Sequence, residues 1–221
     1  NIKDRINLDS KNDSPNYNQS VFEKILEPQN YPLGRFPSKT EFALSFMQQV
    51  AVNLTIGYDN SNMRSVNGPP GTGKTTLLKD IFAELVVKQA YDICLLTSKY
   101  IKGNEDTLYY GKASIGVLTD KIAENNIVVA SSNNGAVQNI VNELPLKIDD
   151  NILPELEKAD YFKDIANADM KEERFWGTFS LEGGKAENMT NILSKIECIV
   201  KYLNEEYKSD SEIYNKFKKQ Y

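Results

Sequence analysis

The chain has 221 residues, of which 40% are hydrophobic and 26% charged, a composition typical of one globular domain with at most a small appendage. Its net charge of −5 argues against an overall basic face for nucleic acid, although an acidic protein can still carry a local basic groove. Histidine is absent, which excludes catalytic and metal sites built on imidazole.

No apolar run reaches the roughly 18 residues that a membrane span needs. The two cysteines, Cys94 and Cys198, lie far apart and have no partner at metal-binding spacing. We therefore expect a cytoplasmic protein with reduced thiols and no membrane partner. Because the chain starts at Asn1 and ends in a lysine-rich helical pattern, we also expect a longer parent protein that supplies the remainder of the domain.

Residues 1–30 form a polar entry segment in which only 21–26 has the apolar character of a short helix or strand. After a loop at 31–37, Ser38 and Glu41 match a capping box, in which each side chain bonds the backbone N–H of the other residue. We expect a helix to follow directly, with apolar residues at helical spacing as far as Leu54 and an end near Gly57.

Residues 68–75 read Gly-Pro-Pro-Gly-Thr-Gly-Lys-Thr, the G-x-x-x-x-G-K-[ST] pattern of a phosphate-binding P-loop. In such a loop the glycines let backbone N–H groups close around phosphates, the lysine reaches the β- and γ-phosphates, and the next hydroxyl holds Mg²⁺. A β-like stretch at 64–67 precedes the motif, and apolar residues at helical spacing follow it over 77–86. A Gly/Pro turn that fits the pattern by chance is the competing interpretation.

The motif predicts an adenine-nucleotide site with Lys74 and Thr75 as catalytic residues and Thr75 as the Mg²⁺ ligand. The predicted nucleotide-binding residues within it are Gly68, Pro70, Gly71, Thr72, Gly73, Lys74, Thr75 and Thr76.

Further along the chain, residues 127–130 are short, apolar and mostly β-branched, as in a buried strand. A polar turn at 131–135 and a helix over 136–144 follow. Strand, loop and helix in this order, found twice, predict an α/β fold with a parallel sheet. We assign 31–148 to this P-loop domain and 149–221 to a helical insertion, since apolar residues there fall at helical spacing, most clearly over 192–207.

Two segments beside the P-loop resemble superfamily 1 helicases. Residues 44–52 are similar to the Q motif of that family, in which a glutamine amide reads the adenine edge. Gln48 is the matching residue, whereas Ser45 stands where the family has asparagine. An amphipathic helix with surface glutamines would give the same pattern.

Residues 127–137 are similar to motif Ia of the helicase branch that includes the nonsense-mediated-decay helicase. In that branch the turn and the following helix N-terminus contact the nucleic-acid backbone. The resemblance makes Ser132, Asn133 and Asn134 candidate contacts to single-stranded DNA or RNA. Asn134 matches the family's asparagine, and Ser132 replaces its common proline. A helix cap without a further role is the competing interpretation.

The resemblance implies an incomplete RecA-like first motor domain, with ATP and Mg²⁺ as cofactors. No apolar strand ending in Asp-Glu follows the P-loop helix, so Mg²⁺ and the attacking water would lack acidic partners. We therefore expect the chain to bind nucleotide without turning it over, although the intact protein would hydrolyse ATP. An AAA-type remodelling ATPase and a non-hydrolysing nucleotide-binding scaffold are the alternatives.

Overall fold

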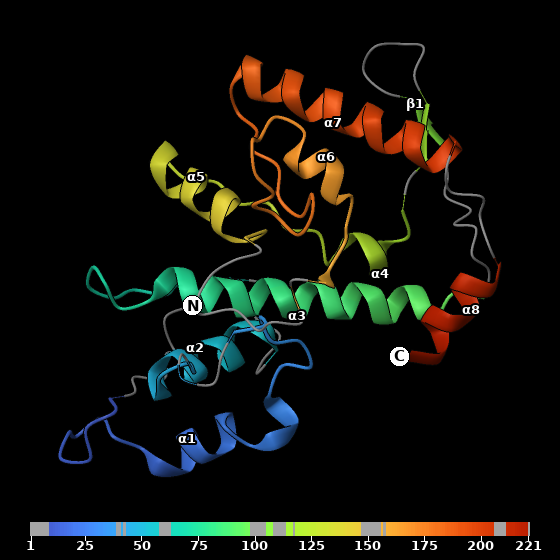
Figure 1. The fold of residues 1–221 in the computed structure, drawn as a ribbon. Helices are drawn as coiled ribbons and strands as arrows, with labels where there is room; N and C mark the ends of the chain where they lie inside the picture. The colour runs from blue at the N-terminus through green and yellow to red at the C-terminus, as the bar shows by residue number, and fades with distance from the viewer. Residues whose placement is uncertain are drawn as a thin grey trace. The chain divides into compact units, whose positions relative to one another are not determined.

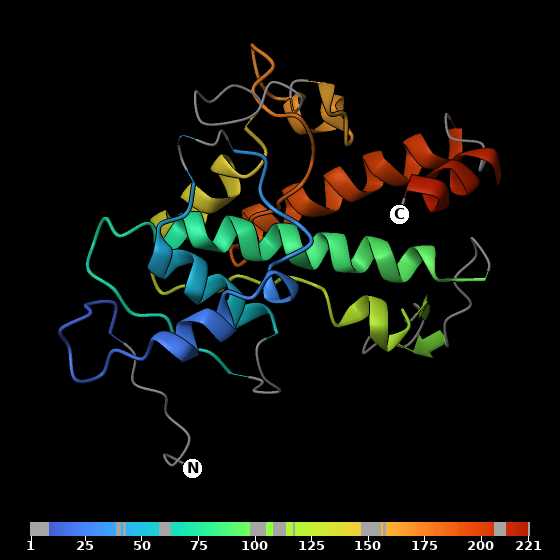
Figure 2. The ribbon, with the colours of Figure 1, turned by 90° about the horizontal axis from the view of Figure 1, so that it is seen from below.

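Helices dominate the part of the chain that the structure describes (Figures 1 and 2). This structure is a computed structural model, and it describes residues 9–38, 41, 43–57, 63–97, 105–107, 114–116, 118–146, 156, 158–205 and 211–220. The chain divides into two compact units. The first comprises Asn1–Phe36 and Ala43–Glu84, and the second comprises Pro37–Phe42 and Leu85–Tyr221.

The first unit contains α1 (Gln19–Ile25), the 3₁₀ turn η2 (Pro28–Asn30), α2 (Phe46–Ile56) and the first half of α3 (Lys74–Cys94). Helices α1 and α2 lie side by side, and Phe22 and Ile25 of α1 pack with Val50 of α2 in its core. Asn18 caps α1, because its side chain accepts a hydrogen bond from the N–H of Val21 at 3.2 Å.

The start expected for α2 is wrong, whereas its end before Gly57 is confirmed. The helix begins at Phe46 and not beside the capping box at Ser38 and Glu41. Ser45 and Gln48 form the capping pair at the start of α2. The side-chain oxygen of Gln48 accepts from the N–H of Ser45 at 2.8 Å. This cap places Gln48 in the first turn of the helix.

Within its described residues, the second unit contains the rest of α3 and five further helices. They are α4 (Asp120–Ala123), α5 (Asn134–Glu143), α6 (Lys163–Asn167), α7 (Ala186–Glu205) and α8 (Ser211–Gln220). The helices predicted after the P-loop and after the 131–135 turn are thereby confirmed as α3 and α5. The helix predicted over 192–207 is confirmed as α7 as far as Glu205, and residues 206 and 207 lie outside the described residues. The domain limits at residues 30 and 148 stay predictions.

The predicted parallel sheet is wrong. Within the described ranges the strands are β1 (Glu105–Thr107) and β2 (Ser114–Gly116), which pair antiparallel with Asp106 opposite Ile115. Residues 127–130 run without strand pairing, and Val128 is 91% exposed. The stretch at 64–67 is also unpaired with any strand.

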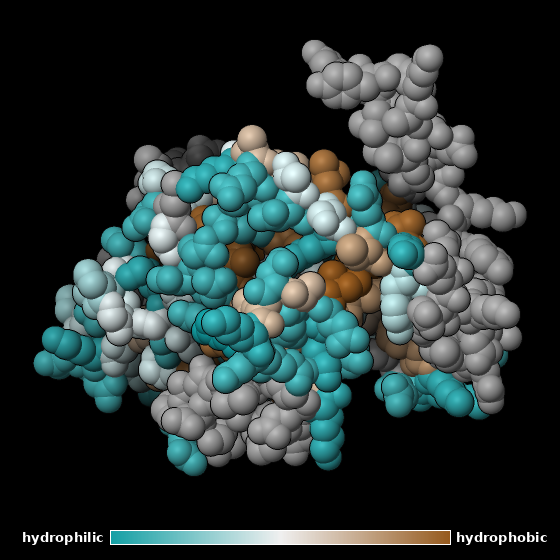
Figure 3. Space-filling view, turned by 45° about the horizontal axis from the view of Figure 1, so that its top comes forward, coloured by the Kyte–Doolittle hydropathy of each residue, from teal (hydrophilic) through white to brown (hydrophobic). Residues whose placement is uncertain are grey.

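The physical reason is that β-branched composition favours a strand only when neighbouring strands satisfy its backbone and cover its side chains. Neither 64–67 nor 127–130 has such a neighbour among the described residues, so both remain outside any strand and mostly exposed. Apolar side chains also reach the surface on α7, as at Leu193 and Val200. Hydrophobic surface of this kind appears as brown areas between hydrophilic side chains in Figure 3.

Where the structure describes the chain, it contains no helix long and apolar enough to cross a bilayer.

Candidate nucleotide-binding site

The P-loop lies in the first unit and leads directly into α3. Gly71 and Gly73 have φ angles of 79° and 74°, in the left-handed region that residues with a side chain adopt only at a cost. Helix α3 begins at the next residue, Lys74, and is 21 residues long. Backbone N–H groups in the first turn of a helix point beyond its end, so the loop and helix together present donors and a positive dipole end.

The lysine of the motif folds back over the loop. Its ammonium donates to the carbonyl oxygens of Gly68 and Pro69, both at 2.8 Å. The Thr72 hydroxyl also donates to the Pro69 carbonyl, at 2.8 Å. These bonds bring Lys74 onto the loop itself, at the position from which its charge could move to a bound phosphate. Pro70, Gly71, Thr75 and Thr76 are exposed around it.

Gln48 joins the start of α2 to the P-loop. While its side-chain oxygen accepts from Ser45, its amide nitrogen donates to the carbonyl of Thr72 at 3.0 Å and to that of Gly73 at 3.4 Å. The sequence placed Gln48 near the nucleotide, and the structure brings it into contact with the loop. The amide here bonds protein backbone, so reading adenine would require it to exchange these partners.

Two buried acids of α3 hold another segment against the P-loop helix. Asp80 accepts from the N–H of Phe36 at 2.8 Å and pairs with Arg35, whose Nη2 lies 3.0 Å from the carboxylate. Glu84, one turn later, accepts from the N–H of Gly34 at 2.8 Å. Asp80 is 4% exposed and Glu84 is 3% exposed. Both carboxylates are therefore committed to fixing residues 34–36 on the side of α3.

The same segment continues into a polar network that reaches α1. The Arg35 guanidinium donates to the side-chain oxygen of Gln49 at 3.3 Å, and Gln49 donates to Asn53 at 2.8 Å. The fully buried Asn53 side chain then donates to the carbonyl of Ile25 at 3.0 Å. This chain of hydrogen bonds fixes the orientation of α2, and with it Gln48, relative to α1 and the P-loop helix.

Sequence reasoning missed the roles of Arg35, Asp80 and Glu84. The prolines and glycine of 31–37 indicate only a loop, and the apolar positions of α3 indicate only its buried face. A usable signal was present, because Leu77, Asp80 and Glu84 share one helical face at spacings of three and four. Acids on the same face as a buried leucine are expected to need partners.

These residues fit a polyphosphate. The two glycines at positive φ, the flexible lysine and the helix start supply donors and positive charge but no carboxylate that would repel phosphate. Fewer ligands are present for Mg²⁺. The exposed Thr75 hydroxyl could bind it, whereas the carboxylates of Asp80 and Glu84 bond residues 34–36.

The second predicted site, the turn at 131–134, lies in the second unit and caps α5. The Asn133 side chain accepts from the N–H of Gly135 at 3.0 Å, and the Ser131 hydroxyl accepts from the N–H of Asn133 at 3.0 Å. Ser132 is exposed, and Asn134 is the first residue of the helix. The turn thus performs the capping role that was the competing interpretation, and its contact with nucleic acid stays a prediction.

A family model described as AAA domain matches residues 45–175, more than half of the chain. The matched range includes Gln48, the P-loop and α5. No curated protein and no solved structure matches the chain.

Proposed function

Because the chain belongs to the AAA domain family, which occurs in P-loop helicase-like proteins, we propose that its P-loop binds ATP together with Mg²⁺. The family assignment points to ATPase and helicase-type proteins in general. The observation that carries the proposal is the loop itself: two glycines at positive φ, followed at once by Lys74 on the first turn of a long helix.

In this proposal the backbone N–H groups of residues 71–76 bind the phosphates. Lys74 exchanges the carbonyls of Gly68 and Pro69 for the β- and γ-phosphates, and the Thr75 hydroxyl holds Mg²⁺. Bound Mg²⁺ would neutralise charge on the phosphate oxygens. Gln48, released from Thr72 and Gly73, would face the base.

We further propose that these 221 residues bind ATP without hydrolysing it. Hydrolysis in P-loop proteins needs an acidic residue near the metal and a group that orients the attacking water. The buried acids of α3 cannot serve, because Asp80 and Glu84 bond residues 34–36. In the intact protein, the proposed activity is a nucleic-acid-dependent ATPase of helicase or translocase type, with the 131–134 turn touching the backbone of single-stranded DNA or RNA.

Substitution of Lys74 tests the nucleotide proposal. In Lys74→Ala we expect ATP affinity to fall about 10- to 150-fold, since hydrogen bonds to charged groups contribute about 1.5–3 kcal/mol. Isothermal titration calorimetry with ATP and Mg²⁺ measures the loss. Lys79→Ala is the matched control, because Lys79 lies on the same helix with its ammonium over the Phe36 ring at 5.4 Å. Equal affinity in the wild type and Lys74→Ala would refute the proposal.

A further inference from the structure

An aromatic-lined cavity lies in the second unit, away from the P-loop motif in the sequence. The residues around the start of α6 and the C-terminal part of α7 line an open cavity of about 450 Å³. The rings of Phe162 and Tyr202 stand at 90° with centroids 5.8 Å apart, and Tyr161 contacts Phe162 at 63° and 4.9 Å. Tyr161 is 53% exposed and Tyr202 is 45% exposed, so two of the three rings are open to solvent.

Hydrogen bonds fix the backbone that carries two of these rings. The N–H of Tyr161 donates to the carbonyl of Trp176 at 3.2 Å, and the Tyr161 carbonyl accepts from the N–H of Thr178 at 2.8 Å. The Thr178 hydroxyl also donates to the carbonyl of Phe162 at 3.2 Å. Phe162 itself has the left-handed backbone conformation, with φ of 54°. The surrounding bonds therefore maintain an unusual conformation that turns the chain into α6.

Close approach of Gly177 supports the same segment. A Cβ on Gly177 would lie 2.5 Å from the carbonyl oxygen of Tyr161, so only glycine allows this pairing. The third ring arrives on a different helix, forty residues later in the sequence. Helices α6 and α7 lie next to each other, which brings Tyr202 to Phe162 (Figure 1).

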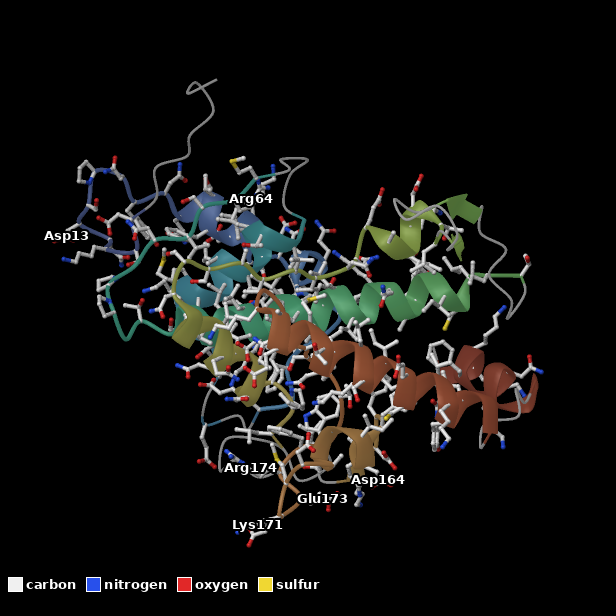
Figure 4. All side chains as sticks on the ribbon, turned by 90° about the horizontal axis from the view of Figure 1, so that it is seen from above. Asp13, Arg64, Asp164, Lys171, Glu173 and Arg174 are labelled. Carbon is white, nitrogen blue, oxygen red and sulfur yellow. The ribbon has the colours of Figure 1, made fainter. Side chains whose placement is uncertain are left out.

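The charge around the rings is negative. Asp160 and Asp164 line the cavity with Lys163, but the Lys163 ammonium is engaged by Glu173 at 2.7 Å. The hydrogen bond and charge of Glu173 raise the pKa of Lys163. The two carboxylates and one ammonium group that line the cavity leave an excess of one negative charge. Figure 4 shows Asp164 on α6 near the loop that carries Glu173. Lys171 and Arg174 belong to that loop and do not line the cavity.

We propose that this cavity binds an organic cation, an alkylammonium or guanidinium group. Three aromatic rings and two carboxylates line the same cavity, so a bound cation would meet both the π-electrons of the exposed rings and negative charge. Open aromatic rings could also stack nucleobases, but the adjacent carboxylates would repel the phosphates of that ligand. The shared chemistry fits either a small quaternary ammonium or a basic side chain of a partner protein.

Choline and its neutral isostere 3,3-dimethylbutan-1-ol test the role of charge. We expect calorimetry or NMR titration of the 221-residue chain to show binding of choline and at least several-fold weaker binding of the alcohol. Tyr202→Leu, which keeps apolar bulk but removes the ring, should weaken choline about two- to five-fold. Asp164→Asn should also weaken it, more at low salt than at high salt. Tyr91→Leu, an exposed tyrosine on α3, should have no effect.

Further titrations distinguish a small cation from a basic protein partner, and either of these from a nucleic acid. Binding of an arginine-containing peptide that choline displaces would identify a basic protein partner, whereas choline binding without peptide binding would identify a small metabolite. Equal binding of choline and the alcohol would overturn the proposal. A second outcome would also overturn the proposal: single-stranded oligothymidylate binds, Tyr202→Leu weakens that binding, and choline does not bind. The rings would then stack nucleobases.

Discussion

Two turns of this molecule lead into helices but differ in what they leave available. At the P-loop, glycines at positive φ turn the chain into α3, and the side chains of Gln48 and Lys74 bond loop carbonyls. At 131–134, the Ser131 and Asn133 side chains bond the turn's own N–H groups. The first arrangement leaves helical N–H groups for an external anion, whereas the second satisfies part of its own donors.

The two helices are also anchored differently. Buried acids within the first half of α3 bond backbone N–H groups of residues 34–36. At the C-terminal end of α5, carbonyls act as acceptors instead. The carbonyl of Leu144, the residue after the helix, accepts from the Trp176 indole at 3.2 Å, and that of Val141 accepts from the Ser180 hydroxyl at 2.8 Å. The P-loop helix is therefore fixed by charged hydrogen bonds near its motif, whereas α5 is fixed by neutral hydrogen bonds at its far end.

Substitution of a P-loop glycine should cause the largest loss of stability. Gly73→Ala combines the left-handed strain of alanine, about 1–2 kcal/mol, with a contact between its Cβ and the Gln48 amide. We expect about 2–3 kcal/mol lower stability, once the hydrogen bonds of Gln48 are also lost. Urea denaturation measures the change. Gly71→Ala is the matched control, because it adds only the strain and has no atom within 4 Å of its Cβ. Equal losses in both variants would contradict the role of Gln48.

Removal of the Asp80 carboxylate should cause the second-largest loss of stability. Asp80→Ala removes the acceptor of the Phe36 N–H and the partner of Arg35. We expect a loss of about 2 kcal/mol, near the middle of the range for hydrogen bonds to charge, since the Arg35 side chain is 43% exposed and screened by solvent. Asp13→Ala, an exposed acid labelled in Figure 4, should change stability by less than about 0.5 kcal/mol. A similar stability for the two variants would show that residues 34–36 do not anchor α3.

Gln48 distinguishes base reading from loop positioning. Gln48→Ala should weaken ATP binding up to about 13-fold, the equivalent of one neutral hydrogen bond of at most about 1.5 kcal/mol. If the amide reads adenine, calorimetry should show little change for pyrophosphate and a loss of preference for ATP over GTP. An equal loss for ATP, GTP and pyrophosphate would assign Gln48 to positioning Thr72 and Gly73 alone.

The smallest effects should separate the two roles of the 131–134 turn. Asn133→Ala removes the cap of α5 and should cost about 1 kcal/mol of stability. Ser132→Ala, at an exposed neighbour, should leave stability within about 0.5 kcal/mol. In the intact protein Ser132→Ala combined with Asn134→Ala should weaken binding of single-stranded nucleic acid at low salt. Unchanged nucleic-acid affinity and unchanged stimulated ATPase activity would leave the turn with capping as its whole function.

The local pattern predicted several parts of this molecule correctly. Apolar residues at helical spacing predicted α3, α5 and α7, because an amphipathic stripe is a property of consecutive residues. The glycines at 68–75 predicted a tight loop, and the positive φ angles of Gly71 and Gly73 agree with that prediction. The competing interpretation of 131–134 as a cap followed equally from its serine and asparagines.

Features that depend on distant partners could not be read in the same way. Residues 127–130 have strand composition, yet a strand is defined by neighbours that hydrogen-bond to it, and here they remain exposed. In the sequence, Asp80 and Glu84 are ordinary acidic residues of a helix. Their role depends on hydrogen bonds from residues 34–36, which only the folded structure brings to them.

The sequence alone located the glycine-rich P-loop motif and the helix that follows it, because glycine freedom and helical periodicity act within a few residues. Only the tertiary structure decided that the amide of Gln48 bonds the P-loop and that Tyr202 meets Phe162 across two helices. Such contacts join residues tens of positions apart, and their energy depends on packing that no local pattern records.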